Sequence, residues 1–484
     1  MLPASFNAAS FNAAVPMLCA GAGGLVVMLA ESWRRKGERM PLGVLAFIAL
    51  AATAVSLLFL WGRNQTSFGV ITADNFGVFV SLIIVTAGLF TVAFSSQVLE
   101  RDGIAEGEYY TLLLFAVVGM VMMAMANDLL VLFIGLEVMS LAVYVMTGIR
   151  RDSLAGIEGA FKYFLLGAFA SAFFLYGIAF TFGVTGSTRL DRVGSFLAAQ
   201  SMTENPMVLL AMGLLIVGFA FKVSAVPFHM WTPDAYEGAP AVVTGFMSTG
   251  VKAAAFAGFV RVFLAAFEPF KADWAPALMV IAAATMIVGT VVGVAQSHLK
   301  RMLAYSSIAH GGYLLVGLVA ANQLGKAAIL FYLAGYAITN LAAFGAIALL
   351  GSRESARDGL HDYAGLWHSR PWVAGLLTVA LLSLGGLPPT VGFIGKWYVF
   401  TAAVSAGYYG LAIIGVLSSV ISVFFYMRVV VMMYMTDTSA ASSPVPVAGA
   451  GLAALAVAVA AIFYLGILPT RLLDLAAASI GSIF

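Results

Sequence analysis

Charged side chains are scarce in this sequence. They make up 10% of its 484 residues, against roughly a quarter in an average soluble domain, while 62% of the residues are hydrophobic. Backbone polar groups cannot stay unpaired in lipid, so a chain of this composition spans a membrane as helices or as a closed barrel. The apolar runs are long and continuous, which favours helices. We therefore predict an all-α, polytopic membrane protein.

Residues for redox and nucleotide sites are also scarce. The single cysteine, Cys19, excludes an internal disulfide and a cysteine-ligated cluster. Of the five histidines, only His310 falls well inside a predicted helix, whereas a haem held by two histidines needs a pair on facing helices. No P-loop is present, and the GAGG at 21–24 lies in an apolar run, where small residues allow close helix packing. We expect no cofactor in this chain, and a net charge of +2 indicates no nucleic-acid partner.

One short segment groups residue types that bind metals. His229, Asp234 and Glu237 fall within nine residues of one another. The segment is rich in proline and connects two apolar runs, so a polar loop is favoured over a metal site, and we expect no metal.

Apolar stretches of about 20 residues identify the spans. There are fourteen of them, at 12–31, 42–61, 75–97, 109–126, 128–147, 160–183, 207–228, 240–266, 275–296, 303–321, 327–350, 372–402, 405–435 and 446–468. The connections are short, and the even number of spans places both termini on one side of the membrane.

The basic residues of the connections predict the orientation. Twelve lie in the odd-numbered connections: Arg34, Arg35, Lys36, Arg39, Arg101, Arg150, Arg151, Lys300, Arg301, Arg353, Arg357 and Arg370. Six lie in the even-numbered connections and the termini: Arg63, Arg189, Arg192, Lys271, Lys326 and Arg471. Because cytoplasmic connections carry the excess of Lys and Arg, both termini are predicted to be periplasmic, in a bacterial inner membrane.

Two of the spans are predicted to be broken by proline. The seventh meets Pro227, and the twelfth contains Pro388 and Pro389; proline removes a backbone donor and clashes with the preceding turn. The breaks lie five helices apart, and an odd unit must be inverted in its second copy, so paired breaks predict an inverted five-helix repeat with a transport site. An ordinary proline kink in a packed bundle is the competing interpretation. The predicted division of the chain is an N-terminal three-helix segment 1–108, first repeat 109–266, second repeat 267–435 and C-terminal helix 436–484.

A few charges lie inside the spans. The basic ones are Lys162, Lys222, Lys252, Arg261, Lys396 and Arg428, and Glu137 is the one carboxylate well inside a span. A charge at the bilayer centre costs about 2.5–3.5 kcal/mol or more, so each needs a partner, water or a function. A structural ion pair between Glu137 and one lysine would explain one lysine but not several. Buried lysines whose proton affinity depends on a nearby carboxylate would instead form a proton relay.

Three of the candidates are less central. Arg261 lies nine residues beyond Lys252, on the opposite helix face and near the helix end, so we expect it to snorkel and leave it out of the site. Lys162 is close to a helix start, where snorkelling and a relay role are equally open. His310 is either a satisfied core histidine or a relay member, since its ordinary pKa suits proton transfer.

The sequence resembles the antiporter-like subunits of NADH-quinone oxidoreductase (respiratory complex I), which are related to multisubunit sodium/proton antiporters. The resemblance covers nearly the whole chain. It rests on FKVSAVPFHMWTPDAYEGAPAVVTGFMSTGVKAAAFAGFVR at 221–261, IGLEVMSLAVY at 134–144 and RMLAYSSIAHGGY at 301–313. The glutamate context of the second string and IEGAFKYFLLGAFASAFFLYG at 157–177 are similar to the N-type subunit, whereas the M-type usually has a glutamate where this sequence has Lys396.

The resemblance implies roles for the buried charges. Glu137 would modulate Lys222, and Lys252 would pass the proton past His310 to Lys396. It also implies partners, namely the M-type and small neighbouring membrane subunits within the lipid bilayer, and a complex whose NADH, FMN, iron–sulfur and quinone sites lie in other subunits. The function expected is proton translocation coupled to quinone reduction. A sodium/proton antiporter subunit is the alternative, and a purely structural scaffold is a third class that gives no reason for so many buried charges.

Overall fold

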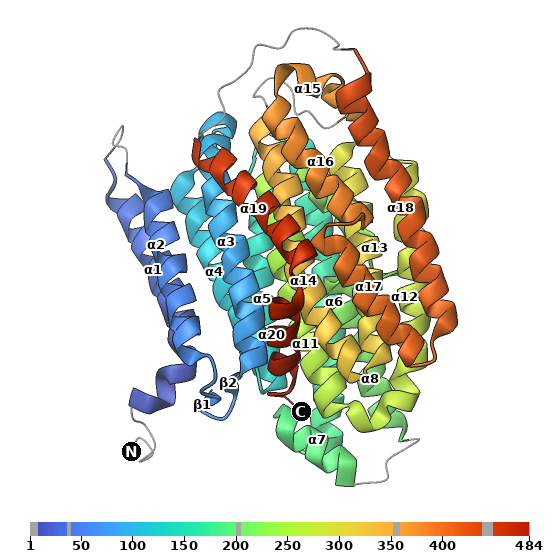
Figure 1. The fold of residues 1–484 in the computed structure, drawn as a ribbon. Coiled ribbons are helices and arrows are strands. Elements are labelled where there is room, and N and C mark those ends of the chain that lie inside the picture. Colours follow the sequence, from blue (N-terminus) through green and yellow to red (C-terminus); the bar gives the residue numbers. More distant parts are fainter. Residues whose placement is uncertain (1–7, 36–39, 200–204, 352–358, 438–448, 484) are drawn as a thin grey trace.

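The helices of this chain stand side by side as one bundle in a computed structural model that describes residues 8–35, 40–199, 205–351, 359–437 and 449–483 (Figure 1). Among the described residues, twelve helices are long and apolar enough to cross a membrane. The seventh predicted span (207–228) ends as a helix at Lys222 and is followed by a short helix at Trp231–Gly238, and the twelfth (372–402) is divided into the helices Pro371–Gly385 and Val391–Ser405. The all-helical architecture of about fourteen spans with two broken helices is therefore confirmed.

The twelve unbroken spans follow the predicted runs closely. They are α1 (Val15–Trp33), α2 (Leu42–Leu60), α3 (Asn75–Asp102), α4 (Glu106–Met125), α5 (Leu129–Thr147), α6 (Leu154–Thr185), α10 with α11 (Ala241–Phe246, Lys252–Arg261), α12 (Lys271–Val294), α13 (Leu299–Ala320), α14 (Gln323–Leu350), α18 (Tyr409–Met435) and α19 (Gly449–Ile467). The broken spans are α8 (Pro206–Lys222) with α9 (Trp231–Gly238), and α16 (Pro371–Gly385) with α17 (Val391–Ser405). Two π-helical turns, η2 (Met247–Val251) and η3 (Val262–Ala266), flank α11.

Capping side chains explain where several spans begin. Asp74 accepts a hydrogen bond from the Gly77 N–H at the start of α3, and Asp128 caps α5 in the same way. Ser153 accepts from the Gly156 N–H, so α6 begins at Leu154 and not at the predicted residue 160. A side-chain oxygen that pairs with one of the first free N–H groups fixes a helix start more sharply than hydropathy does.

Several short elements among the described residues were not predicted, and three of them help to form one end of the bundle. A short hairpin pairs β1 (Gln65–Ser67) with β2 (Ile71–Ala73). The connection after α6 contains α7 (Leu190–Ala199), and the segment 436–484 holds α20 (Thr470–Ile480) as well as α19. The two short helices are amphipathic: α7 buries Leu190, Val193 and Leu197 along one face. Such a helix is too short and too polar for a search based on span length.

The hairpin, α7 and the end of α20 lie together at one end of the bundle, which we call the terminal face; α15 (Leu366–Ser369) lies at the other end, the opposite face (Figure 1). Both ends of the described chain meet this hairpin region, since the Ala13 N–H donates to Ser67 Oγ and the Phe76 N–H donates to Ser482 Oγ. The prediction that both ends lie on one side therefore agrees with the structure. Of the basic residues used for orientation, Lys36, Arg39, Arg353 and Arg357 lie outside the described residues.

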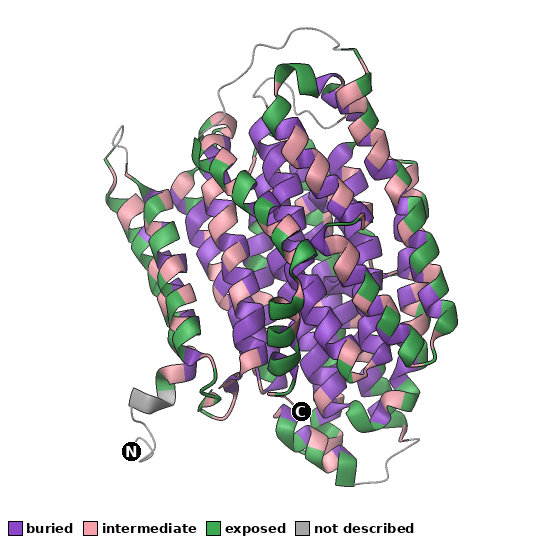
Figure 2. Cartoon of the chain, in the orientation of Figure 1, coloured by how far each residue is buried: buried purple, intermediate pink, exposed green. Residues whose placement is uncertain are grey.

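The centre of the bundle is formed by three spans. Their most apolar windows, in α10–α11, α13 and α14, are each 94% buried, whereas those of α1, α2 and α19 are 33% buried. Figure 2 shows the same gradient from the buried interior to the exposed flanks. Lys252 and His310 are on central helices, so the polar groups lie where protein, not lipid, surrounds them. The four-part division of the chain and the inversion of the repeat stay predictions.

Candidate functional site

The first break follows directly after Lys222. The helix α8 ends there, Ser224 adopts the left-handed conformation (φ 62°), and the Val226–Pro227 peptide is cis. Side chains replace the missing helical bonds: Trp231 Nε1 donates to the Phe221 carbonyl (3.0 Å), and the Val226 N–H donates to Thr285 Oγ1 (2.9 Å). Irregular backbone at membrane depth is stable only when it is paired in this way.

Lys222 is bonded to hydroxyl groups of α5. Its Nζ donates to Ser140 Oγ (2.7 Å) and to the Tyr144 hydroxyl (3.2 Å). It also lies 5.1–5.6 Å from the ring centres of Tyr144, Tyr163 and Phe221, where aromatic faces attract a cation. With 3% of its surface exposed, this ammonium group is surrounded by neutral partners.

Glu137 does not form an ion pair with Lys222. It accepts a hydrogen bond from Ser171 Oγ on α6 (2.5 Å), and the described residues hold no ion pair that includes it. It stands three residues before Ser140 and seven before Tyr144, so all three share one face of α5. The structural ion pair considered from the sequence is therefore absent among the described residues, and Glu137 lies one helical turn from Ser140, which bonds to Lys222.

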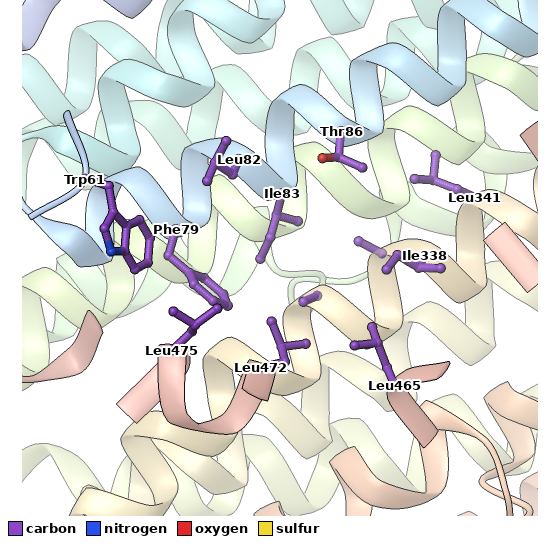
Figure 3. Close-up of a pocket in the computed structure, with 12 residues that line it drawn as sticks. Trp61, Phe79, Leu82, Ile83, Thr86, Ile338, Leu341, Leu465, Leu472 and Leu475 are labelled. Carbon is purple, nitrogen blue, oxygen red and sulfur yellow. The ribbon is translucent and has the colours of Figure 1, made fainter. Parts of the chain in front are cut away.

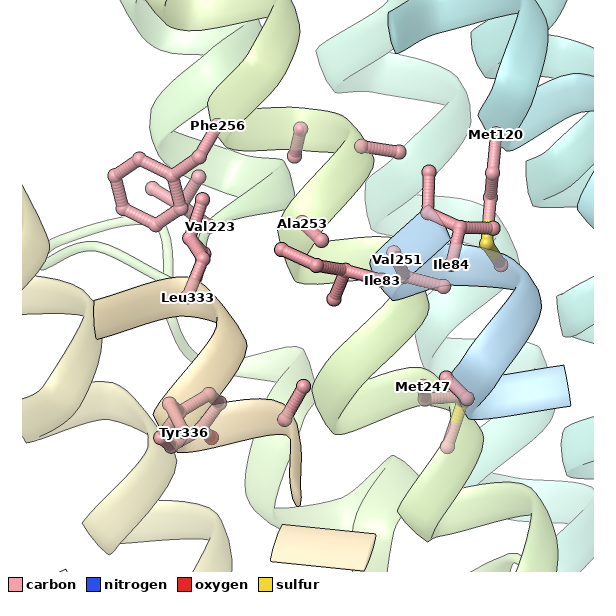
Figure 4. Packing of buried hydrophobic residues seen from close by; sticks show 14 of the residues in the cluster. Ile83, Ile84, Met120, Val223, Met247, Val251, Ala253, Phe256, Leu333 and Tyr336 are labelled. Atoms are coloured by element: carbon pink, nitrogen blue, oxygen red, sulfur yellow. The ribbon is translucent and has the colours of Figure 1, made fainter. Parts of the chain in front are cut away.

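Lys252 contacts α13. It follows the π-helical turn η2, a feature that often marks functional sites. Its Nζ donates to Ser307 O (2.5 Å) and Ser307 Oγ (2.7 Å). The Tyr336 hydroxyl donates to the same Ser307 Oγ (2.8 Å), which connects Lys252 to α14, and Lys252 Nζ lies 5.3 Å from the centre of the Tyr336 ring. Figure 4 shows Tyr336 and Leu333 on α14 beside the span that carries Met247, Val251 and Ala253.

Gly311 allows Lys252 to approach the first break. A Cβ atom at this position would lie 2.9 Å from the Val223 carbonyl oxygen and 3.6 Å from Lys252 Nζ. Because the glycine has no side chain, the ammonium of Lys252 lies close to the backbone that directly follows Lys222. The side chains of Lys222 and Lys252 themselves point to different helices, α5 and α13.

His310 lies between Lys252 and the second break. Its Nδ1 is 2.6 Å from the Tyr332 hydroxyl, and its Nε2 is 3.3 Å from the Tyr426 hydroxyl. A small cavity of about 10 Å³ is lined by His310 and by Ser383 and Leu384 at the end of α16. This volume is just enough for one water molecule. Both nitrogens have hydroxyl partners, and both interpretations of this residue remain open.

Lys396 joins the two halves of the second break. From α17 its Nζ donates to the carbonyls of Leu384 (2.8 Å) and Gly385 (3.0 Å), the last residues of α16, and to Ser419 Oγ (2.8 Å). The negative end of a helix dipole favours a cation at this position. Lys222 precedes its break and Lys396 follows its own, so the two lysines do not occupy equivalent positions.

The same capping contact recurs with other basic side chains. Arg101, Arg261, Lys271, Lys300 and Arg428 donate to carbonyls at the last turns of α14, α4, α13, α9 and α12. These contacts satisfy free carbonyls at helix ends. Lys222 and Lys252 differ from this group, because neither caps a helix end; they are the buried cations with the least structural reason to be present.

Lys162 lies apart from the other candidates. Its side chain is 42% exposed and pairs with Glu158 (2.5 Å) and Asp234 (2.8 Å). Arg301 bonds to Asp234 and to Glu237 in turn. These ion pairs occupy the carboxylates of the segment considered for a metal, and the described residues contain no cluster of three metal-ligating side chains.

Arg261 corrects a prediction. The expected snorkelling is wrong, because the side chain is 5% exposed and forms an ion pair with Asp74, which is also 5% exposed. Two bonds of 2.8 and 2.6 Å join them. Removing one partner of such a pair costs about 3–5 kcal/mol, since the other charge stays buried. The sequence signal was an Asp directly before an apolar run, which is a helix cap and a possible partner.

Sequence reasoning also missed the hydroxyl groups around the buried lysines and His310. Ser140 and Tyr144 could have been found, because they follow Glu137 at helical spacing. Ser307, Tyr332 and Tyr336 give no such signal among 17 tyrosines and many serines. An apolar pocket of about 250 Å³ between α3, α14 and α20 is lined by residues such as Phe79 and Leu472 (Figure 3). No titratable residue lines it, so it plays no part in this site.

Comparison with known proteins shows which family this chain belongs to. Residues 126–422 match the model of the NADH:quinone oxidoreductase/Mrp antiporter transmembrane family. NADH-quinone oxidoreductase subunit N of Trichlorobacter lovleyi is 42% identical over 476 residues, 98% of each chain. A chain of respiratory complex I from Thermus thermophilus is 34% identical, with a TM-score of 0.81 over 96% of this chain and 99% of that one. A chain of the Mrp complex from Dietzia is 21% identical, with a TM-score of 0.81 over 98% and 97%, which shows the fold alone. The chain is an integral membrane protein that belongs to the NADH-quinone oxidoreductase subunit N family.

Proposed function

We propose that this chain is the N-type, proton-translocating membrane subunit of an NADH-quinone oxidoreductase. The observation that supports it most directly is the set Lys222, Lys252, His310 and Lys396, which are all buried and are each bonded to hydroxyl groups or backbone carbonyls. The mechanism is a relay: Lys222 takes a proton under the influence of Glu137, and Lys252 receives it beside the first break. His310, with its tyrosine hydroxyls, carries it to Lys396.

The rest of the complex supplies the driving reaction. NADH, FMN, iron–sulfur clusters and quinone act in other subunits, and the membrane partners are the M-type and small subunits beside this one. The terminal face points to the periplasm of a bacterial inner membrane, because the basic residues of the opposite face, among them Arg101 and Arg301, mark the cytoplasmic side.

The test uses the assembled complex. Lys222→Ala and Glu137→Ala should leave assembly and NADH oxidation by an artificial acceptor intact while NADH-driven proton pumping falls. Arg151→Ala, which removes a basic side chain that is 84% exposed, serves as the control. Normal pumping in both relay variants would contradict the assigned pathway.

A sodium/proton antiporter subunit is the second candidate, and the shared fold with a chain of the Mrp complex supports it. The higher identity to subunit N relatives favours the first. Purification distinguishes them: flavin and iron–sulfur proteins that co-migrate with this chain support complex I, and an assembly of cation-antiporter subunits without them supports the alternative.

A further inference from the structure

The apolar pocket between α3, α14 and α20 is a groove that follows the helices (Figure 3). Its lining residues recur at helical spacing along α3, from Phe79 to Thr86, and along α14, from Ala334 to Leu341. Each stretch corresponds to about 10 Å along the helix axis. Apart from Thr86 and the indole of a tryptophan, every side chain that lines the groove is a hydrocarbon.

The groove is open on the outer side of the bundle. Leu475 of α20 lines it and is 44% exposed. Ile338 lies on its floor and is partly exposed, although the most apolar window of α14 is 94% buried. The cause is the shortness of α20, which contacts both α3 and α14 but covers the space between them only in part.

The depth of the groove places it in one leaflet of the membrane. The 28 residues of α3 extend over about 42 Å, whereas the hydrocarbon core of a bilayer is about 30 Å thick. Phe79 and Thr86 lie one and three turns from the start of α3, which corresponds to about 6 and 16 Å. In a centred helix the groove therefore begins at the edge of the hydrocarbon core on the terminal face and ends before the bilayer centre.

A basic residue without a carboxylate partner stands at the shallow end. Trp61 lines that end (Figure 3), and tryptophan is enriched where hydrocarbon meets head groups. The Gly62 N–H donates to Asn75 Oδ1 (2.7 Å), which fixes this connection to the start of α3. Arg63 follows directly, is exposed and forms no ion pair among the described residues. Its guanidinium is free to bind a phosphate with paired hydrogen bonds.

The chemistry of the groove calls for an apolar occupant. Water does not fill an apolar cavity, and an empty one forfeits the dispersion contacts of its walls. The acyl chain of a phospholipid runs along the membrane normal, as the groove does, and carries its phosphate at the end where Arg63 stands. A side chain of a neighbouring subunit would enter across the groove and bring no phosphate.

We propose that this groove binds one acyl chain of a membrane phospholipid whose phosphate group is held by Arg63 at the terminal face. The bound chain completes the contact of α20 with α3 and α14, which α20 alone leaves open. The inference needs the membrane location of the chain and does not depend on proton translocation.

The first experiment places the assembled complex in liposomes of phosphatidylethanolamine and phosphatidylglycerol, with a phosphatidylglycerol that carries a photoreactive diazirine on one acyl chain. Illumination should label the floor of the groove around Ala337, which is 3% exposed, as mass spectrometry of the peptides will show. Val420 of α18, which is 64% exposed, reports lipid that merely surrounds the protein. Label on α18 with none on the floor would overturn the proposal and leave a side chain of a neighbouring subunit as the occupant.

The second experiment fills the groove. Ala337→Phe should abolish the label on the stretch 79–86 of α3 and leave that on α18 unchanged. Ala456→Phe, the same substitution on the exposed surface of α19, is the matched control and should leave both unchanged. Persistent labelling of α3 in Ala337→Phe would contradict the proposal. If that variant fails to assemble, the labelling pattern of the unsubstituted complex decides alone.

The third experiment tests the phosphate contact. Arg63→Gln should raise several-fold the amount of photoreactive lipid needed for half-maximal labelling of the floor, because a charge-assisted bond is lost. Arg192→Gln, which removes another exposed arginine of the terminal face, should not. Equal effects of the two variants, or no effect of Arg63→Gln, would overturn the role of Arg63. None of these measurements uses NADH-driven pumping, so their failure is distinguishable from failure of the proposed function.

Discussion

The two broken spans hold their lysines in different ways. Lys222 is bonded to the side-chain hydroxyls of Ser140 and Tyr144 on another helix, and Glu137 stands one turn away on that helix. Lys396 is bonded to the last carbonyls of α16, across its own break. A movement of α5 would change the surroundings of Lys222, whereas the carbonyls of Lys396 move only if the break itself changes. The surroundings of Lys222 therefore depend on a neighbouring helix, whereas most of the bonds of Lys396 depend on its own break.

We expect the largest effects when Lys222 or Lys396 is replaced by methionine, which has a similar length and no charge. Both variants should lose NADH-driven pumping, but Lys396→Met should also destabilise the subunit. It leaves the Leu384 carbonyl without its donor and the Gly385 carbonyl with only the long bond from Ser419 Oγ (3.5 Å), and an unsatisfied buried group costs about 1–3 kcal/mol. The temperature at which the subunit is lost from the complex on native gels measures the difference. Equal stability of the two variants would contradict the distinction.

Glu137→Gln should impair pumping without affecting assembly. Glutamine still accepts the hydrogen bond of Ser171, so the packing survives while the charge that acts on Lys222 is lost. A charge at about one helical turn is worth roughly a kcal/mol or more in a protein interior, enough to lower pumping several-fold. Glu158→Gln, on an exposed ion pair of α6, is the control. Full pumping by Glu137→Gln would show that the charge of Glu137 is not needed for proton translocation.

Removal of a single hydroxyl partner of Lys222 or Lys396 should have a smaller effect on pumping than removal of the lysine. Ser140→Ala takes away the shorter bond of Lys222, and a hydrogen bond to a charged group contributes about 1.5–3 kcal/mol. Ser419→Ala should matter less, because Lys396 keeps two carbonyl partners. Pumping rates of the two variants provide the measurement, and a larger defect in Ser419→Ala would reverse the expected order.

Lys162→Ala should have the smallest effect. Its partners Glu158 and Asp234 are partly exposed, and exposed ion pairs contribute about 0–1 kcal/mol. Pumping and assembly close to those of the wild type would separate this lysine from the relay. A loss comparable with that of Lys222→Met would place it in the pathway and extend the relay to the opposite face.

Hydropathy predicted the spans and proline predicted both breaks, because each depends on local composition. The central charges were found in the same way: a lysine or glutamate such as Lys252 or Glu137 stands out in an apolar run. Their connections were not predictable, since Ser307 and Tyr336 reach Lys252 from helices distant in sequence. Arg261 was misjudged for the same reason, because its partner Asp74 lies 187 residues away. The amphipathic helices α7 and α20 escaped a search for continuous apolar runs.

The number of protons translocated per NADH by a complex that carries Lys252→Met tests the central claim most directly. Lys252 lies beside the first break and is linked through Ser307 to the tyrosines that surround His310, so the account predicts a lower ratio while quinone reduction continues. An unchanged ratio in a fully assembled complex would show that protons do not pass along this row of lysines.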